Sequence, residues 1–181
     1  NKPIFSLHEN AQLPLASLTK IMTVVVAREI TTKDISKLID DALMQSSNEA
    51  ASALASTDNN FINLMNKKAK ELELNQTYFL NETGLDVSEN LAGGYGSASD
   101  TVKLIRYALK NNPHLFETTT INSTFNTNPY ATTTPELIAS KTGFTDLAGG
   151  NLAVVFDAGF DHPVAVVVLG SSKEGRFIDV Q

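Results

Sequence analysis

The chain has 181 residues, 42% of them hydrophobic and 19% charged, which is enough apolar material for one folded core and excludes a disordered, collagen-like or coiled-coil protein. Its 20 acidic and 14 basic residues give a formal net charge of −6, which argues against a nucleic-acid partner. The absence of cysteine excludes disulfides, thiolate nucleophiles and cysteine-ligated metals, and no apolar run approaches the roughly 20 residues that span a bilayer.

The first two thirds of the chain carry mostly helical patterns. Residues 4–7 form a short apolar run, which predicts a strand followed by a loop. Residues 17–28 contain no Gly or Pro and repeat apolar side chains at helical spacings, which predicts a largely buried helix. A glycine-rich stretch at 81–97 predicts a long loop. Capping residues and apolar stripes predict four more helices, which begin near residues 35, 48, 59 and 98, and the last of these ends near 111.

The last third changes from helical spacings to β patterns. Residues 118–134 are rich in Thr and Asn and predict an irregular strand or hairpin at the surface. Three strands are predicted at 137–142, 151–156 and 164–169, the last two antiparallel because a short hairpin loop joins them. Residues 173–181 predict the start of a closing helix. Helices in the middle and strands mainly at the end predict an α+β fold, in which helices pack on a sheet.

Three short motifs follow one another along the chain: S-x-x-K at residues 17–20, S-x-N at 46–48 and K-T-G at 141–143. Each alone has a structural interpretation, as a helix start, a second helix start and the end of a strand, and the first two are common by chance. All three in this order are far less common. We therefore interpret them as one catalytic constellation.

The residue types fit nucleophilic catalysis. A serine hydroxyl is a weak nucleophile that needs a base within hydrogen-bond reach, and Ser17 and Lys20 lie one helical turn apart on the same face. A lysine serves as that base only when burial or a neighbouring cation lowers its pKa. Apolar neighbours in the 17–28 helix supply burial, and Lys141 supplies a cation. Backbone N–H groups at the helix start suit a developing oxyanion.

The other two motifs suit the handling of a peptide. Ser46 stands at a turn after a helix, where its hydroxyl can relay a proton between the base and a leaving amine, and Asn48 can hydrogen-bond a substrate amide. The ammonium of Lys141 and the hydroxyl of Thr142 suit a carboxylate. Gly143 allows a substrate backbone to approach the strand edge.

The residues around these motifs resemble the D-alanyl-D-alanine carboxypeptidase family, the low-molecular-weight penicillin-binding proteins. Residues 15–23 are similar to that family's active-site helix, and residues 46–51 to its S-x-N-D-A segment, with Glu49 in place of the usual Asp. Residues 141–152 are similar to its K-T-G strand and the turn that follows. Further likenesses, which extend the resemblance over nearly the whole chain, lie at 83–85, 97–100 and 126–129.

The resemblance implies a fold, a reaction and roles for the site residues. The fold is β-lactamase-like or penicillin-binding-protein transpeptidase-like, an antiparallel sheet flanked by helices with an all-helical lobe. In the reaction, Ser17 attacks the penultimate D-Ala carbonyl of a peptidoglycan stem peptide ending in D-Ala-D-Ala, and water hydrolyses the acyl-enzyme. Lys20 is implied as the base, and the backbone N–H groups of Ser17 and Phe144 as the oxyanion hole. The implied catalytic residues are Ser17, Lys20, Ser46 and Asn48, and the implied substrate-binding residues are Lys141, Thr142, Gly143 and Phe144.

The resemblance also bears on partners and location. It implies β-lactams as covalent inhibitors that acylate Ser17, no cofactor, and a place in the cell envelope outside the cytoplasm, and it leaves membrane anchorage open. The residues themselves argue against a metal, because His8, His114 and His162 are far apart and lack ligand spacing.

We expect one serine D,D-peptidase domain over residues 1–181, with a helical lobe at about 31–115 and a sheet part at 1–30 and 116–181. In the family, an N-terminal strand and helix come before the strand predicted here at 4–7, and that N-terminal strand lies in the sheet between the 4–7 strand and the last strand. Folded proteins avoid unpaired edges inside a sheet. We therefore expect residues upstream of this chain in a longer protein.

Three alternatives stay open. One is a D,D-endopeptidase that acts on peptidoglycan cross-links. Another is a serine β-lactamase, which would need a glutamate to position water; Glu82 and Glu89 are candidates without the expected sequence pattern. The third is a non-catalytic peptidoglycan-binding module, against which the complete motif set argues. Outside the motifs, Arg176 is expected in a surface salt bridge in preference to a carboxylate contact in the cleft.

Overall fold

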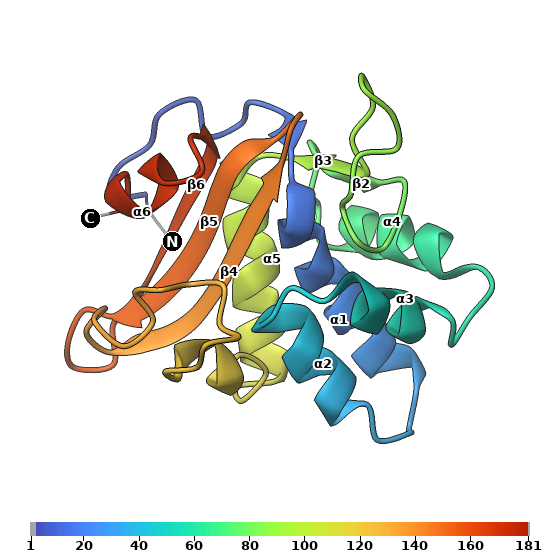
Figure 1. Cartoon of the computed structure of the whole chain (residues 1–181), viewed down its shortest axis with the longest axis horizontal. Coiled ribbons are helices and arrows are strands. Elements are labelled where there is room, and N and C mark those ends of the chain that lie inside the picture. Colours follow the sequence, from blue (N-terminus) through green and yellow to red (C-terminus); the bar gives the residue numbers. More distant parts are fainter. Residues whose placement is uncertain (1–2, 181) are drawn as a thin grey trace.

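An antiparallel sheet of three strands forms one side of the molecule (Figure 1). The structure is a computed structural model and describes residues 3–180. The strands are β4 (Leu137–Thr145), β5 (Gly149–Asp157) and β6 (Pro163–Ser171), in the order β4-β5-β6. All three strand predictions are confirmed, and each strand is longer than its apolar run because backbone pairing continues beyond the buried side chains.

Helices form the other side. They are α1 (Thr19–Ile30), α2 (Ser36–Leu43), α3 (Asn48–Ala55), α4 (Phe61–Glu71) and α5 (Ala98–Asn111). Figure 1 shows α5 beside the sheet, α1 near the centre, and α2, α3 and α4 on the side away from the strands. Residues 19–27 of α1 are all buried, as in a helix that lies inside a core. The five predicted helices are thereby confirmed.

One hydrophobic core joins the two sides and fixes where the motifs meet. The sheet packs against α5, and a short 3-10 turn before α1, η1 (Ala16–Leu18), contacts β4 and β5. This contact brings the first motif beside the third. The same core includes the buried apolar side chains of α1. Core side chains that connect strands and helices include Leu18, Val25, Ile105, Ala139, Ala153 and Val155.

A small second sheet has no counterpart in the sequence-based prediction. It consists of β1 (Leu13–Pro14), β2 (Tyr78–Phe79) and β3 (Gly94–Gly96), in the order β1-β3-β2. Strands of two or three residues are too short to show a period of two, so hydrophobic patterning does not reveal them. They hold the loop of residues 80–93 next to the segment that leads into η1.

Two sequence-based predictions are wrong. Residues 4–7 form no strand: Ile4 is 86% and Phe5 83% exposed, and no strand of the described chain pairs with them. A short apolar run becomes a strand only where a sheet edge accepts it. The expected strand or hairpin at 118–134 is a 3-10 turn, η2 (Glu117–Thr120), followed by turns. There Asn126 donates to the carbonyls of Thr119 and Ile121, which satisfies the backbone locally in place of strand pairing.

The chain ends in a short helix, α6 (Gly175–Ile178), at the predicted place. Residues 1, 2 and 181, which belong to the predicted sheet part and closing helix, lie outside the described residues. None of the helices in the described part of the chain is both long and apolar enough to cross a membrane.

Candidate active site

Ser17 lies in η1, a turn clamped between two neighbouring segments. The preceding residue, Ala16, has a φ of 47°, a left-handed conformation that is strained for a residue with a Cβ atom. A Cβ atom on Gly84 would lie 1.9 Å from the carbonyl oxygen of Ala16, so only glycine fits there. A Cβ atom on Gly143 would lie 3.2 Å from the backbone nitrogen of Ser17. Glycines on both sides therefore let the backbone approach this serine closely.

Lys20 is fully buried one turn after Ser17. Its Nζ donates hydrogen bonds to Ser17 Oγ at 2.9 Å, to Asn48 Oδ1 at 2.8 Å and to the carbonyl oxygen of Thr83 at 2.9 Å. The amide oxygen and the carbonyl oxygen have no proton to give back. When the ammonium loses a proton, these two acceptors keep two N–H groups and the lone pair faces the serine hydroxyl.

The pKa of Lys20 is set by burial and by nearby carboxylates, which act in opposite directions. Burial lowers the pKa of Lys20 from 10.5 to about 8, and the nearby carboxylates of Glu82 and Glu49 act in the opposite direction. A lysine with this pKa is neutral in roughly one molecule in ten at pH 7. The side chain can thus accept a proton at neutral pH, as a base for Ser17 must.

Ser46 and Asn48 enter the site from the turn between α2 and α3. Ser46 has a φ of 59°, and its hydroxyl accepts a hydrogen bond of 2.8 Å from Lys141 Nζ. Ser47 caps α3 by accepting from the N–H of Ala50, which fixes where Asn48 begins the helix. Asn48, which we expected to hydrogen-bond a substrate amide, accepts from Lys20. Ser46, which we expected to exchange a proton with Lys20, is hydrogen-bonded to Lys141.

Lys141 projects from β4 and is 1% exposed. Besides Ser46, its Nζ donates to the carbonyl oxygen of Thr142 at 2.9 Å. Its pKa lies well below 10.5, first because of burial and then because Lys20 and Arg176 are positive and close. The groups that influence the pKa of Lys141 are thus cations, and no carboxylate is among them. Positive charge is therefore concentrated on this side of the cleft.

Arg176 in α6 is the main functional candidate that the sequence placed wrongly. Among the described residues it forms no salt bridge: it is 7% exposed, and its Nη1 donates to the carbonyl oxygen of Gly143 at 2.5 Å. Its Nε is buried and has no hydrogen-bond partner among the described residues. The guanidinium also stacks over Phe177, 4.7 Å from the ring centre. A buried arginine with a spare donor beside β4 is suited to an anion.

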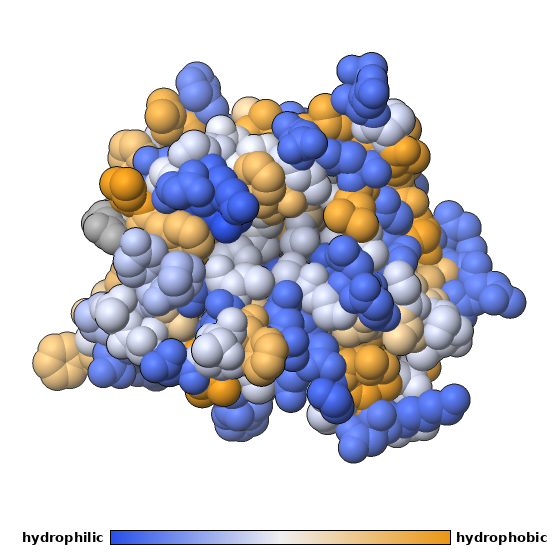
Figure 2. Space-filling model, viewed as in Figure 1, coloured by the Kyte–Doolittle hydropathy of each residue, from blue (hydrophilic) through white to orange (hydrophobic). Residues whose placement is uncertain are grey.

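The remaining predicted residues lie along the same strand. Thr142 donates its hydroxyl proton to Thr127 Oγ1 at 2.6 Å, and Thr127 in turn donates to the carbonyl oxygen of Met44 at 3.2 Å. Phe144 carries its ring outward, 42% exposed, with Lys173 Nζ 5.4 Å from the ring centre. The predicted site residues are thus brought together around the contact between β4 and η1. Figure 2 shows the same face hollowed between the strand side and the helical side.

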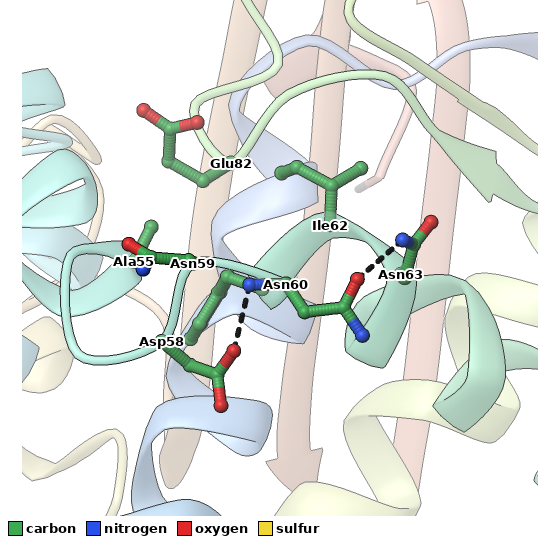
Figure 3. Close-up of a pocket in the computed structure, with 8 residues that line it drawn as sticks. Ala55, Asp58, Asn59, Asn60, Ile62, Asn63 and Glu82 are labelled. Carbon is green, nitrogen blue, oxygen red and sulfur yellow. Dashed lines mark hydrogen bonds between the residues drawn. The ribbon is translucent and has the colours of Figure 1, made fainter.

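Neither glutamate considered for a β-lactamase hydrogen-bonds Ser17 or Lys20 within the described residues. Glu82 accepts a hydrogen bond from Ser52 at 2.6 Å, and Glu89 lies exposed in the loop. Glu82 also borders a separate cavity of about 250 Å³ at the turn between α3 and α4 (Figure 3). There the carboxylate of Asp58 accepts a hydrogen bond from the backbone N–H of Asn60 and so stabilises the turn. Within the described residues, no cluster of His, Asp or Glu is placed to hold a metal ion.

Comparison with known proteins gives consistent matches. A family model described as D-alanyl-D-alanine carboxypeptidase matches residues 27–173, a stretch that begins after Ser17 and Lys20. A D-alanyl-D-alanine endopeptidase of Escherichia coli K12 is 31% identical over 99% of this chain and 71% of its own length. The D-alanyl-D-alanine carboxypeptidase DacF of Bacillus subtilis 168 is 26% identical over 97% of this chain, which spans 56% of that relative.

A solved structure shows the same architecture. Penicillin-binding protein D2 of Listeria monocytogenes, in its ampicillin-bound form, superposes with a TM-score of 0.84 at 26% identity, over 97% of this chain and 87% of that one. The likeness confirms the fold class predicted from the sequence.

Proposed function

The chain belongs to the D-alanyl-D-alanine carboxypeptidase family of serine peptidases, and from that membership we propose that it cleaves the D-Ala-D-Ala end of peptidoglycan stem peptides through an acyl-enzyme on Ser17. The observation that carries this proposal is the contact of 2.9 Å between the buried Nζ of Lys20 and Ser17 Oγ. It supplies the base that a serine nucleophile requires.

In the first step, neutral Lys20 removes the proton of Ser17 as its oxygen attacks the penultimate D-Ala carbonyl. Asn48 and the carbonyl of Thr83 hold the amine in the orientation that this transfer needs. The negative charge on the former carbonyl oxygen is stabilised by the backbone N–H groups of Ser17 and Phe144. The close packing of Gly143 against the Ser17 nitrogen supports this pairing of donors.

The strand side of the cleft recognises the free carboxylate of the terminal D-Ala. Lys141 and Arg176 provide positive charge, and Thr142 provides a hydroxyl that can turn from Thr127 toward the ligand. The terminal carboxylate lies one residue beyond the scissile bond, so its binding sets the register of the peptide on Ser17.

Ser46 returns a proton to the leaving amine. Its hydroxyl accepts from Lys141, whose low pKa makes the ammonium a better acid than an ordinary lysine. We expected Ser46 to relay a proton between Lys20 and the leaving amine. We now propose that Ser46 relays it from Lys141 instead. In the second step, the attacking water passes a proton through Ser46 to the neutral Lys141, and Lys20 returns its proton to the Ser17 oxygen as the acyl bond breaks. The peptide leaves one D-Ala shorter. A β-lactam places a reactive carbonyl and a carboxylate in the same two positions, so we propose that it acylates Ser17.

A second candidate function is D,D-endopeptidase activity on cross-linked stem peptides. The 31% identity to the Escherichia coli endopeptidase favours it. Both reactions use the same acyl-enzyme and differ in whether the leaving group is free D-Ala or a cross-linked chain. In either case we place the protein at the cell envelope, outside the cytoplasm, where its substrate is.

The test compares two substrates by mass spectrometry. The protein and its Ser17→Ala variant are incubated with a synthetic stem pentapeptide and, separately, with a cross-linked peptide dimer. We expect the wild type to release D-Ala from the pentapeptide and the variant to release none. Cleavage of the dimer alone would favour the endopeptidase, and two unchanged substrates would contradict the proposal.

A further inference from the structure

The loop of residues 80–93 crosses from the helical side of the molecule to the end of β4. At the crossing, the carboxylate of Asp86 accepts a hydrogen bond of 2.9 Å from Thr145 Oγ1 and one of 3.3 Å from the N–H of Leu147. Thr145 Oγ1 in turn accepts from the N–H of Ala148 at 3.2 Å. Asp86 therefore organises the turn between β4 and β5, although it belongs to a segment far away in the sequence.

This turn begins directly after Phe144, at the end of β4, where Arg176 holds the carbonyl of Gly143 but no side chain of β5 faces the last two residues of the strand. The last two pairs of the β4–β5 ladder place Phe144 opposite Gly150 and Thr145 opposite Gly149, so no partner side chain packs across them. The ring of Phe144 is 42% exposed and does not anchor its own backbone in the core. The orientation of the Phe144 N–H thus depends on how the following turn is fixed.

The segment that carries Asp86 is itself rigid. Asn81 Oδ1 accepts from the N–H of Gly84 at 2.7 Å, and Asn81 Nδ2 donates to the carbonyl of Leu85 at 2.9 Å. Gly84 is packed against the carbonyl of Ala16, and the neighbouring Thr83 carbonyl accepts from Lys20. One short stretch therefore touches the serine turn at one end and the end of β4 at the other.

From this geometry we propose that Asp86 is a positioning residue for the oxyanion hole: it holds the turn after β4 so that the N–H of Phe144 stays aligned with that of Ser17. The inference rests on the proposed function, since it assumes that an oxyanion forms between these two donors. Removal of one oxyanion donor typically costs 100- to 1000-fold in rate, and misalignment of one costs less. The effect falls on the chemical step, because the groups that hold the substrate carboxylate stay in place.

The test measures the acylation rate constant and the dissociation constant of a fluorescent penicillin separately, by stopped flow over a range of concentrations. For Asp86→Ala we expect the acylation rate constant to fall about 10- to 100-fold, while the dissociation constant changes less than about threefold. Thr145→Val, which removes the same hydrogen bond from the other side, should reproduce most of the loss. Asp86→Asn keeps an acceptor for Thr145 and should recover part of the rate. Glu89→Ala, in the same loop, is the matched control and should behave as wild type.

The double variant separates positioning from general destabilisation. If Asp86 acts through Thr145, adding Thr145→Val to Asp86→Ala lowers the rate little further. An unchanged acylation rate in Asp86→Ala, multiplicative losses in the double variant, or equal losses in rate and binding would each overturn the proposal. If Asp86→Ala does not fold, Thr145→Val and Asp86→Asn decide in the same way. A wild type that no penicillin acylates would instead contradict the proposed function itself.

Discussion

The two sides of the cleft each bury a lysine, but they surround it differently. On the helical side, Lys20 has two carboxylates, Glu82 and Glu49, that offset burial, and its pKa settles at about 8. On the strand side, burial lowers the pKa of Lys141 well below its ordinary value, and two cations, Lys20 and Arg176, act in the same direction. The same residue type therefore serves two purposes. A lysine balanced by acids exchanges protons near neutral pH, whereas a lysine among cations marks a place built to receive an anion.

The largest expected effect comes from breaking the helical side. Lys20→Met keeps the volume of the side chain and removes the base, so the rate of acylation by penicillin should fall about 1000-fold or more. Stopped-flow labelling measures the rate, and circular dichroism verifies the fold. A variant that is acylated at the rate of the wild type would show that Ser17 takes its proton acceptor from elsewhere.

The pKa of Lys20 also predicts how stability depends on pH. In the unfolded chain this lysine titrates near 10.5, and in the folded protein at about 8. Between these values the unfolded state binds more protons at Lys20, so this lysine should contribute about 2 kcal/mol to a rise in the free energy of unfolding between pH 8 and 10. Lys141, whose pKa is also lowered, contributes to the rise in the same direction. Urea unfolding across this range measures the slope.

Lys20→Met is the matched variant for that experiment and should show a smaller slope than the wild type. Lys68 donates hydrogen bonds to the carboxylates of Glu29 and Glu71, which raise its pKa, and it does not interfere because its contribution is lost only above pH 10.5. Equal slopes in the two proteins would contradict the assigned pKa of Lys20.

On the strand side, Arg176→Gln should weaken recognition of the terminal carboxylate. A charge-assisted hydrogen bond contributes about 1.5–3 kcal/mol, so we expect KM for the stem peptide to rise about 10- to 100-fold with a smaller change in kcat. A peptide with an amidated terminus provides the comparison. It should be a poor substrate for the wild type and lose little more with the variant. An equal rise in KM for both peptides would contradict a role of Arg176 in binding the carboxylate.

The smallest effect is expected from the acids that balance Lys20. Because Glu82 raises the pKa of Lys20, Glu82→Gln should lower it below about 8 and move the acidic limb of the pH–acylation profile to lower pH by less than about one unit. At pH 7 the variant should then be acylated up to a few-fold faster. The profile of Glu89→Gln, measured in parallel, should coincide with that of the wild type. A shift of the acidic limb to higher pH in the Glu82 variant would contradict the prediction that Glu82 raises the pKa of Lys20.

Much of this could be predicted from the sequence, because the three motifs carry the family resemblance and their order survives in the fold. The family, the fold class and the assignment as a serine peptidase are confirmed, while the division into lobes and the residue roles stay predictions. The backbone carbonyl of Thr83 escaped prediction because a backbone acceptor carries no residue identity. Arg176 was placed wrongly because its burial depends on how α6 returns to β4, which no local pattern encodes.

The strand predicted at residues 4–7 failed for a related reason. Its apolar side chains satisfy the local pattern, but a strand requires an edge to pair with, and pairing is decided by the whole sheet. The loop of residues 80–93 shows the opposite case. Its glycines indicated only a loop, yet its backbone and Asp86 connect both sides of the cleft.

The central claim is that Ser17 is the nucleophile, and peptide mapping after treatment with a β-lactam tests it most directly. We predict one covalent adduct per protein, located by tandem mass spectrometry on Ser17 and absent from Ser17→Ala. An adduct on Ser46 or another residue, or an adduct that persists in Ser17→Ala, would contradict it.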